Sequence, residues 1–247
     1  MLSEDARTRL EALGFEDDDV STLLSHFEDA EKRGKTGHGL SRVAWLEMLE
    51  LDPGARPLRL VAEDGFERWN GRGALGYLVL EEIVCATLAH PPARARLIVA
   101  ERCFPSGMLG YWVRRLAERG LVAALTATSP RRLPHPEGGP PLTGTNPLAI
   151  AIPSSDGHPL VTDVSMGAVT HGQVLTGEAA PEELVPFGGT QAHKAFALAV
   201  GLELFVSSLA GDEYGAVLVV ARPEHDPVPG FRALAGGLRL PGDEKRA

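Results

Sequence analysis

The stretch TGTNPLAIAIPSSDGHPLVTDV, residues 143–164, decides the fold of this chain. Two apolar runs, 147–153 and 159–164, flank the pair Asp156-Gly157, which is a frequent turn in tight hairpins. The sequence therefore predicts two antiparallel strands joined by a short turn. Asp163 is a carboxylate at the end of the otherwise apolar second strand, and such a group often orients a neighbouring side chain.

Further apolar runs on both sides of this hairpin predict the rest of a sheet with helices between its strands. The additional strands are RLIVA at 96–100, LVAALTA at 121–127 and GAVLVVA at 215–221. The helices are predicted at 78–88, 107–118 and 193–209. The segment SPRRLPHPEGGPP, 129–141, is predicted as a surface loop because it is rich in proline and charge.

The first fifty residues have a helical pattern. One helix is predicted before Gly14, a second from Asp17 and a third after Gly39. After residue 222 the chain contains few apolar side chains, which is typical of a loosely held end. We therefore predict three parts: a helical N-terminal domain over 1–60, a mixed α/β nucleotide-binding domain over 61–222, and a loosely ordered C-terminal tail over 223–247.

Composition restricts the kind of protein this chain can be. Lysine and arginine number 24 against 33 aspartates and glutamates, and the formal net charge of −9 disfavours a nucleic-acid partner. The N-terminal residues are acidic where a signal peptide is basic, and no uninterrupted apolar run reaches the roughly 18 residues of a membrane span. We therefore expect a cytoplasmic protein without a membrane partner. Cys85 and Cys103 are too few for a disulfide framework, and we expect two buried free thiols.

The motif GRGALG, residues 71–76, matches the G-x-G-x-x-G pattern of dinucleotide-binding loops. In a Rossmann fold a strand runs into this loop, and an acidic residue ends the next strand. The preceding letters DGFERWN do not predict a strand, and HPPARARL supplies no acidic residue at the expected distance. We therefore predict a packed helix after the loop and no Rossmann fold. The histidines lack the spacing of metal ligands, so no metal site is predicted.

Three further segments follow one another in an informative order. They are RGKTGHGLSR at 33–42, the stretch 143–173 that ends in VSMGAVTHGQ, and PFGGTQAHKAFALAVGLELFVSSLAG at 186–211. Together they resemble the malate/L-lactate dehydrogenase family of NAD(P)-dependent oxidoreductases, which lack a Rossmann fold. The middle segment is the most specific, because its G-T-N-P turn, two strands and a glycine nine residues after Asp163 occur in the family's order.

The resemblance implies an α+β fold: a helical N-terminal domain followed by an α/β domain around a mixed sheet. It also implies a homodimer, NADH or NADPH as the cofactor, and reduction of a small 2-oxo acid or cyclic 2-imino acid that bears a carboxylate. The residues at matching positions are His38, Arg42 and Asp163 for catalysis, and Asn146, Pro147, Gly188, Gly189 and Lys194 for the cofactor.

The chemistry of these residue types suits that assignment. The planar guanidinium of Arg42 can hold a carboxylate through two parallel hydrogen bonds, and His38 can position or deliver a proton. Gly188 and Gly189 would let the backbone approach a phosphate or ribose, with the Lys194 charge nearby. Structural alternatives stay open: a solvated helix charge for Arg42, a turn residue for His38, an Asx turn for Asp163 and a solvated lysine for Lys194.

The chain departs from the family pattern at several polar positions. Gly37, Gly167 and Gln173 replace a serine, a serine and a lysine, and Trp45 and Leu46 stand where a tyrosine is usual. The family's catalytic histidine is replaced by Phe104, Pro105 or Ser106. Loss of a proton donor costs about 10²–10⁴ in rate when nothing replaces it.

Three explanations of these departures are open. In the first, His38 or Asp163 takes over proton delivery to a substrate that is already protonated, as an iminium is, so that a dedicated acid is less necessary. In the second, the chain is a divergent, repurposed member that keeps nucleotide binding and serves another reaction in a specialised biosynthetic pathway. In the third, it is a non-catalytic member that acts as a binding partner, and Trp45 and Trp112 would then mark a contact surface rather than a pocket.

Overall fold

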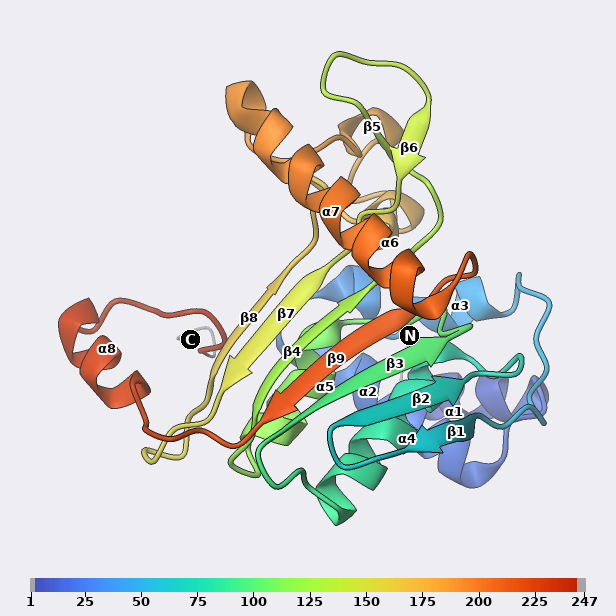
Figure 1. Cartoon of the computed structure of the whole chain (residues 1–247). Helices are drawn as coiled ribbons and strands as arrows, with labels where there is room; N and C mark the ends of the chain where they lie inside the picture. Colours follow the sequence, from blue (N-terminus) through green and yellow to red (C-terminus); the bar gives the residue numbers. More distant parts are fainter. Residues whose placement is uncertain (1–2, 244–247) are drawn as a thin grey trace.

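The computed structural model describes residues 3–243, and Figure 1 shows one large sheet with helices on both of its faces. The helices are α1 Ser3–Ala12, α2 Asp17–Lys32, α3 Arg42–Leu46, α4 Gly76–Ala89, α5 Leu109–Ala117, α6 His171–Leu175, α7 Ala192–Ala210 and α8 Val228–Ala235. Short 3₁₀ turns occupy η1 Thr36–His38, η2 Pro181–Glu183 and η3 Gly189–Gln191. Each helix that the sequence predicts is present; the third, predicted to extend from after Gly39 to before Pro53, is shorter and ends at Leu46.

The main sheet has seven strands in the order β1-β2-β3-β9-β4-β7-β8. Their bounds are β1 Leu58–Ala62, β2 Phe66–Asn70, β3 Ala95–Glu101, β4 Val122–Ala127, β7 Leu148–Ile152, β8 Leu160–Val164 and β9 Ala216–Ala221. β2 and β3 run parallel, and the other neighbours are antiparallel. This arrangement confirms the predicted mixed sheet. A separate pair, β5 Leu133–Pro134 and β6 Pro141–Thr143, closes the segment predicted as a plain loop.

The hairpin quoted at the outset is present as β7 and β8. The two strands are antiparallel, with Ala149 opposite Asp163 and Ile152 opposite Leu160. Ala149, Ala151 and Val161 are buried, because one face of this hairpin packs against α5. The hairpin forms one edge of the sheet and places Asp163 beside the first turn of that helix.

Helices cover the two faces of the sheet unequally. α5 packs on one face beside α4 and α2, and α7 crosses the opposite face over β3, β9 and β4 (Figure 1). On β3, Ile98 and Ala100 belong to the larger core on the α5 side, whereas Val99 packs with Val206 and Val217 under α7. Because successive side chains of a strand point to opposite faces, a strand covered on both sides is apolar at nearly every position.

One strand corrects the sequence analysis. Residues 66–70, part of DGFERWN, form β2 and run directly into the glycine loop, so β2, α4 and β3 are a parallel strand–helix–strand unit. The strand was missed because it contains a buried charge. Glu67 is almost fully buried, pairs with Arg96 at 2.8 Å and accepts a hydrogen bond from the Trp69 indole at 2.9 Å.

The glycine loop nevertheless offers no room for a pyrophosphate. A Cβ atom at Gly71 would overlap the carbonyl oxygen of Arg102, and one at Gly76 would lie 2.6 Å from the carbonyl oxygen of Pro105. The backbone that follows β3 therefore fills the space in front of α4, where a Rossmann fold binds its ligand. The acidic residue at the end of β3, Glu101, instead binds Arg68 and Asn70.

The C-terminal segment, predicted as a loosely ordered tail, includes a helix that the sequence analysis did not predict. It contains α8, whose start is fixed by Asp226: this carboxylate accepts hydrogen bonds from the backbone of Val228 at 3.0 Å and of Ser155 at 2.7 Å. Arg232 forms ion pairs with Asp156 and Asp243. The segment has few apolar side chains, and these polar contacts connect it to the rest of the protein instead. Residues 244–247 of the predicted tail lie outside the described residues.

The two thiols have different environments. Cys103 is buried, as expected, and burial raises its pKa to about 12. Cys85 is exposed, contrary to the prediction, and its thiol donates to Glu81 at 3.0 Å. The apolar α4 sequence obscured this exposure, because Cys85 lies with Glu82 and Ala89 on the exposed side of that helix.

α7 combines an apolar sequence with an exposed outer face. By length and composition alone, the segment Gly189–Ala210 could cross a membrane, a criterion that core helices of soluble proteins also satisfy. Its inner residues Ala199, Val206 and Ala210 pack on the sheet side, whereas Leu198, Leu204 and Phe205 are exposed.

The buried ion pair of β2 yields a stability prediction. Glu67→Ala removes the carboxylate that compensates the buried charge of Arg96, so we expect the free energy of unfolding to fall by about 3–5 kcal/mol. Urea denaturation followed by circular dichroism measures this loss. Glu63→Ala, in the exposed β1–β2 turn, is the control and should change stability little. Equal stability of the two variants would contradict the assignment.

Candidate active site

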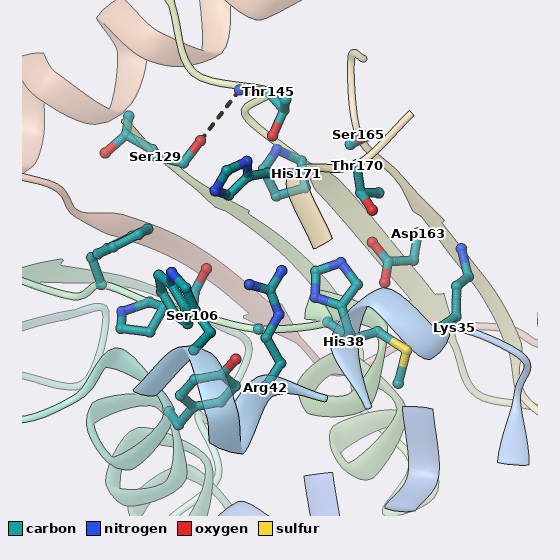
Figure 2. Close-up of a pocket in the computed structure, with 18 of the residues that line it drawn as sticks. Lys35, His38, Arg42, Ser106, Ser129, Thr145, Asp163, Ser165, Thr170 and His171 are labelled. Atoms are coloured by element: carbon teal, nitrogen blue, oxygen red, sulfur yellow. Dashed lines mark hydrogen bonds between the residues drawn. The ribbon is translucent and has the colours of Figure 1, made fainter. Parts of the chain in front are cut away.

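A cavity of about 150 Å³ lies where segments far apart in the sequence meet. They are η1 with α3, the connection from Phe104 to Met108 after β3, the residues that follow β4 and precede β7, and the stretch from the end of β8 into α6. Figure 2 shows Arg42 and His38 on one side of this space, with His171 and Thr145 across from them. A space of this size matches a small organic acid.

Arg42 is the buried cation of the cavity. Its side chain is 8% exposed, its Nε donates to the Gly37 carbonyl oxygen at 2.7 Å, and its guanidinium lies 5.0 Å from the centre of the Trp45 ring. Burial lowers its pKa, and no carboxylate within residues 3–243 forms an ion pair with it. A buried arginine without a counter-ion is suited to bind an anion.

The backbone around Arg42 is held by a contact between two glycines. A Cβ atom at Gly37 would lie 2.9 Å from the backbone nitrogen of Gln173, and one at Gly172 would overlap the Gly37 carbonyl oxygen. A Cβ at Gly172 would also lie 2.7 Å from Nη2 of Arg42. The guanidinium is therefore fixed between η1 and α6. Gly37, which in sequence looks like a lost serine, lets this contact form and orients Arg42 through its carbonyl group.

His38 lies beside Arg42 on the same side of the cavity. Burial, and then the charge of Arg42, lower the pKa of His38 to about 3, so the imidazole is neutral near pH 7. Its Nδ1 is buried and has no hydrogen-bond partner among the described residues. The predicted proximity of His38 to Arg42 is present, and the ring faces the cavity as a neutral polar group (Figure 2).

Asp163 lines the cavity but orients a helix rather than His38. Its Oδ2 accepts a hydrogen bond from the backbone of Gly110 at 2.9 Å, in the first turn of α5. Burial raises the pKa of Asp163, whereas the Gly110 hydrogen bond and the Lys35 and Arg114 charges oppose that rise. Asp163 thus holds the backbone at the start of α5, and not a neighbouring side chain as the sequence analysis expected.

The predicted cofactor residues occupy different places. Pro147 lines the cavity, whereas Asn146 is fully buried next to it and donates to the Ala199 carbonyl oxygen at 3.0 Å and to Glu203 at 2.6 Å. Asn146 therefore ties the start of β7 to α7. Gly188, Gly189 and Lys194 are exposed and do not line the cavity.

Arg132 and His171 are among the cavity residues that were missed in sequence. Arg132 belongs to the segment predicted as a surface loop, and His171 follows the strand-ending Asp163 by eight residues. Burial, then the charges of Arg132 and Arg42, lower the pKa of His171 to about 4. His171 could have been found from the sequence, because it lies inside segment 143–173, which is the most specific part of the family resemblance.

Some of the departures from the family pattern line this cavity. Phe104, Pro105 and Ser106, which stand where the family has a histidine, all line it. Trp45 also lines it, but Trp112 is 0% exposed and donates its indole N–H to the Ser106 carbonyl oxygen at 2.9 Å. Trp112 therefore does not lie on a contact surface, contrary to one alternative above.

Two larger hollows open beside the cavity. One, of about 610 Å³, shares Lys35, Met108 and Asp163 with it. Its basic residues are Lys32, Arg33, Lys35, Arg114 and Arg239, and its acidic residues are Asp29, Asp163 and Asp243. The other, of about 820 Å³, shares Phe104 and Thr128 and contains more acidic than basic side chains. We call the first the basic cleft.

The small cavity contains a buried arginine without a carboxylate partner among the described residues, and it adjoins the basic cleft; this chemistry suits small anionic ligands. Comparison with known proteins identifies the family. The malate/L-lactate dehydrogenase family profile matches residues 2–184, and this chain belongs to that family. The resemblance inferred from the three sequence segments is thereby confirmed.

Individual relatives are dehydrogenases and reductases. (2R)-3-sulfolactate dehydrogenase (NADP(+)) of Chromohalobacter salexigens is 30% identical over 237 residues, which cover 83% of this chain and 69% of the relative. A Delta(1)-pyrroline-2-carboxylate/Delta(1)-piperideine-2-carboxylate reductase of Pseudomonas aeruginosa is 31% identical over 193 residues, and the match covers 67% of this chain and 53% of that relative.

Solved structures show the same fold. A dehydrogenase from Sinorhizobium meliloti has a TM-score of 0.80 at 25% identity, with 98% of this chain and 88% of that chain covered. The predicted α+β fold with a mixed sheet is therefore confirmed.

The glycine contact predicts a sensitive substitution. Gly37→Ala places a methyl group against the backbone of α6, so we expect a loss of about 1–3 kcal/mol in unfolding free energy and a displaced Arg42. Chemical denaturation measures the loss of unfolding free energy, and weaker binding of a small carboxylate reports the displacement of Arg42. Gly65→Ala, which meets open space, is the control. Unchanged stability and binding in Gly37→Ala would refute the role of this contact.

Proposed function

We propose that this protein is an NAD(P)H-dependent oxidoreductase that reduces a small 2-oxo acid or cyclic 2-imino acid. The observation that carries the proposal is Arg42, buried in a small cavity without a carboxylate partner among the described residues. The family membership and the dehydrogenase and reductase activities of the relatives support it.

In this proposal Arg42 binds the substrate carboxylate through its Nη atoms. Its Nε is occupied by the Gly37 carbonyl group, so the fork has a fixed direction before substrate arrives. The enclosed position makes each hydrogen bond to the carboxylate stronger than it would be in water. His38, neutral and within the same cavity, is placed to hydrogen-bond the group being reduced.

The residues present fit a nicotinamide dinucleotide. The small cavity admits only one end of such a molecule, and the adjoining basic cleft has the volume typical of a ligand site. Arg114 in this cleft has a buried Nε without a hydrogen-bond partner among residues 3–243, and an excess of cations suits phosphate groups. When bound, the reduced nicotinamide supplies a hydride to the substrate carbon.

The remaining cofactor assignments follow from this placement. Pro147 would bound the nicotinamide end, with Asn146 holding its backbone turn against α7. Contacts from Gly188, Gly189 and Lys194 to the cofactor, the choice between NADH and NADPH, and a cytoplasmic location stay predictions. We also propose a homodimer through the exposed apolar face of α7, formed by Leu198, Leu204 and Phe205, which sedimentation velocity tests.

The reductase proposal is tested by binding and turnover. Pure protein should enhance the fluorescence of NADH or NADPH and oxidise it when a 2-oxo acid or a cyclic 2-imino acid is added. Arg42→Lys keeps the charge but loses the fork, so kcat/KM should fall about 10–100-fold, mainly through KM.

Arg94→Lys, at an exposed position between α4 and β3, is the matched control and should keep the wild-type kcat/KM. Failure of both nucleotides to bind would exclude the reductase. Binding without turnover of any tested acid would favour the non-catalytic or repurposed alternative.

The basic cleft makes a separate prediction. Arg114→Gln removes a cation proposed to hold a cofactor phosphate, and the Kd for NADPH should rise about 10–100-fold. Fluorescence titration measures this change. Arg119→Gln, exposed beyond the end of the same helix, is the control. Equal Kd values for the two variants would place the cofactor elsewhere.

A further inference from the structure

His171 is a cavity-lining group that the proposed function has not used. Its side chain is half-buried, makes no hydrogen bond or ion pair with any described residue, and lies opposite Arg42 and His38 (Figure 2). Neither ring nitrogen is among the buried polar atoms that lack a partner. Both nitrogens are therefore accessible to a ligand in the cavity.

The backbone holds this histidine on both sides. Thr170 caps α6 and forms a reciprocal capping box with Gln173, with hydrogen bonds of 3.2 Å and 2.9 Å. On the other side of His171, Gly172 is in contact with Gly37 and with the guanidinium of Arg42. The backbone of His171 is consequently held in place next to Arg42, the proposed carboxylate-binding residue.

The charges around His171 are mostly positive. The other titratable or charged residues that line the cavity are Lys35, His38, Arg42, Tyr77, Arg132 and Asp163. Asp163 is the single carboxylate among them, and it is hydrogen-bonded to the α5 backbone. Arg42 and Arg132 together disfavour a proton on His171. An anion bound between these arginines would cancel that repulsion and favour the protonated imidazole.

We propose that His171 is a catalytic residue, the acid that delivers a proton to the carbonyl oxygen of a 2-oxo acid held by Arg42. This inference rests on the reductase function proposed above. As hydride adds to the carbonyl carbon, the π-bond pair moves to oxygen. The N–H bond of the His171 imidazolium then breaks, its proton forms the hydroxyl group, and the electron pair stays on nitrogen. Solvent returns a proton to the ring.

The other polar groups of the cavity are less suited to this step. Nδ1 of His38 is buried and has no partner among the described residues, whereas neither ring nitrogen of His171 is buried in this way. Burial raises the pKa of Tyr77, and Asp163 already accepts the Gly110 hydrogen bond. The positions that replace the family's histidine, Phe104 to Ser106, supply no titratable side chain. His171 thus offers a replacement from a different segment of the chain.

The first test measures protonation without turnover. NMR titration of histidine-labelled protein should show one ring, absent in His171→Gln, whose pKa is about 4 in the free protein. Saturating oxalate, an unreactive dicarboxylate, should raise the proton affinity of that ring at least about tenfold. If oxalate binds and this titration does not move, the inference is overturned while the reductase proposal stands. If oxalate does not bind, the anion site on which both rest is refuted.

The second test separates two classes of substrate. With a 2-oxo acid, His171→Gln should lower kcat about 10²–10⁴-fold and leave NADPH affinity unchanged. With a cyclic 2-imino acid, whose iminium form is already protonated, the loss should be far smaller. His158→Gln, exposed on the β7–β8 turn, is the control. Equal losses for both substrates, or a wild-type kcat with the 2-oxo acid, would overturn the role of His171.

Discussion

The contact between the backbones of Gly37 and Gly172 is the constraint on which the cavity depends. It joins η1, near the N-terminus, to α6, which follows the β7–β8 hairpin, and it leaves no space for a side chain at either position. The carbonyl oxygen of Gly37 then fixes Arg42 from one side and Gly172 bounds its guanidinium from the other. A close backbone approach of this kind requires glycine, whatever polar group related chains have there.

The cations that line this cavity outnumber its carboxylates: Lys35, Arg42 and Arg132 line it, and Asp163 is the single carboxylate among the lining residues. Arg42 and Arg132 each lower the pKa of His171, and Arg42 also lowers that of His38. Because both imidazoles are neutral near pH 7, the protein avoids adding charge to an already positive cavity. The electrostatic cost of burying Arg42 remains, and an anionic ligand relieves it.

Periodicity and turn chemistry predicted most of the fold, including the β7–β8 hairpin, the buried β3 and the helices. The elements that were missed depend on pairing rather than pattern. β2 buries Glu67 against Arg96, and α8 is fixed by Asp226 and Arg232. In the sequence, these charged residues are typical of the protein surface, and only their partners in the fold show otherwise. Among the cavity residues, His38 and Arg42 could be predicted from the family resemblance. Arg132 could not, because a loop rich in proline and arginine gives no indication of where its side chains point.

Whether the cavity keeps a polar group that the family pattern places on another segment depends on which segments border the cavity, and not on the position of that group in the sequence. A proton donor must reach the reacting atom, and any segment that borders the cavity can supply it. The connection from Phe104 to Ser106 borders it with apolar side chains and a hydroxyl, whereas α6 borders it with His171. The lack of a histidine between Phe104 and Ser106 therefore does not leave the cavity without an imidazole, because His38 and His171 both line it.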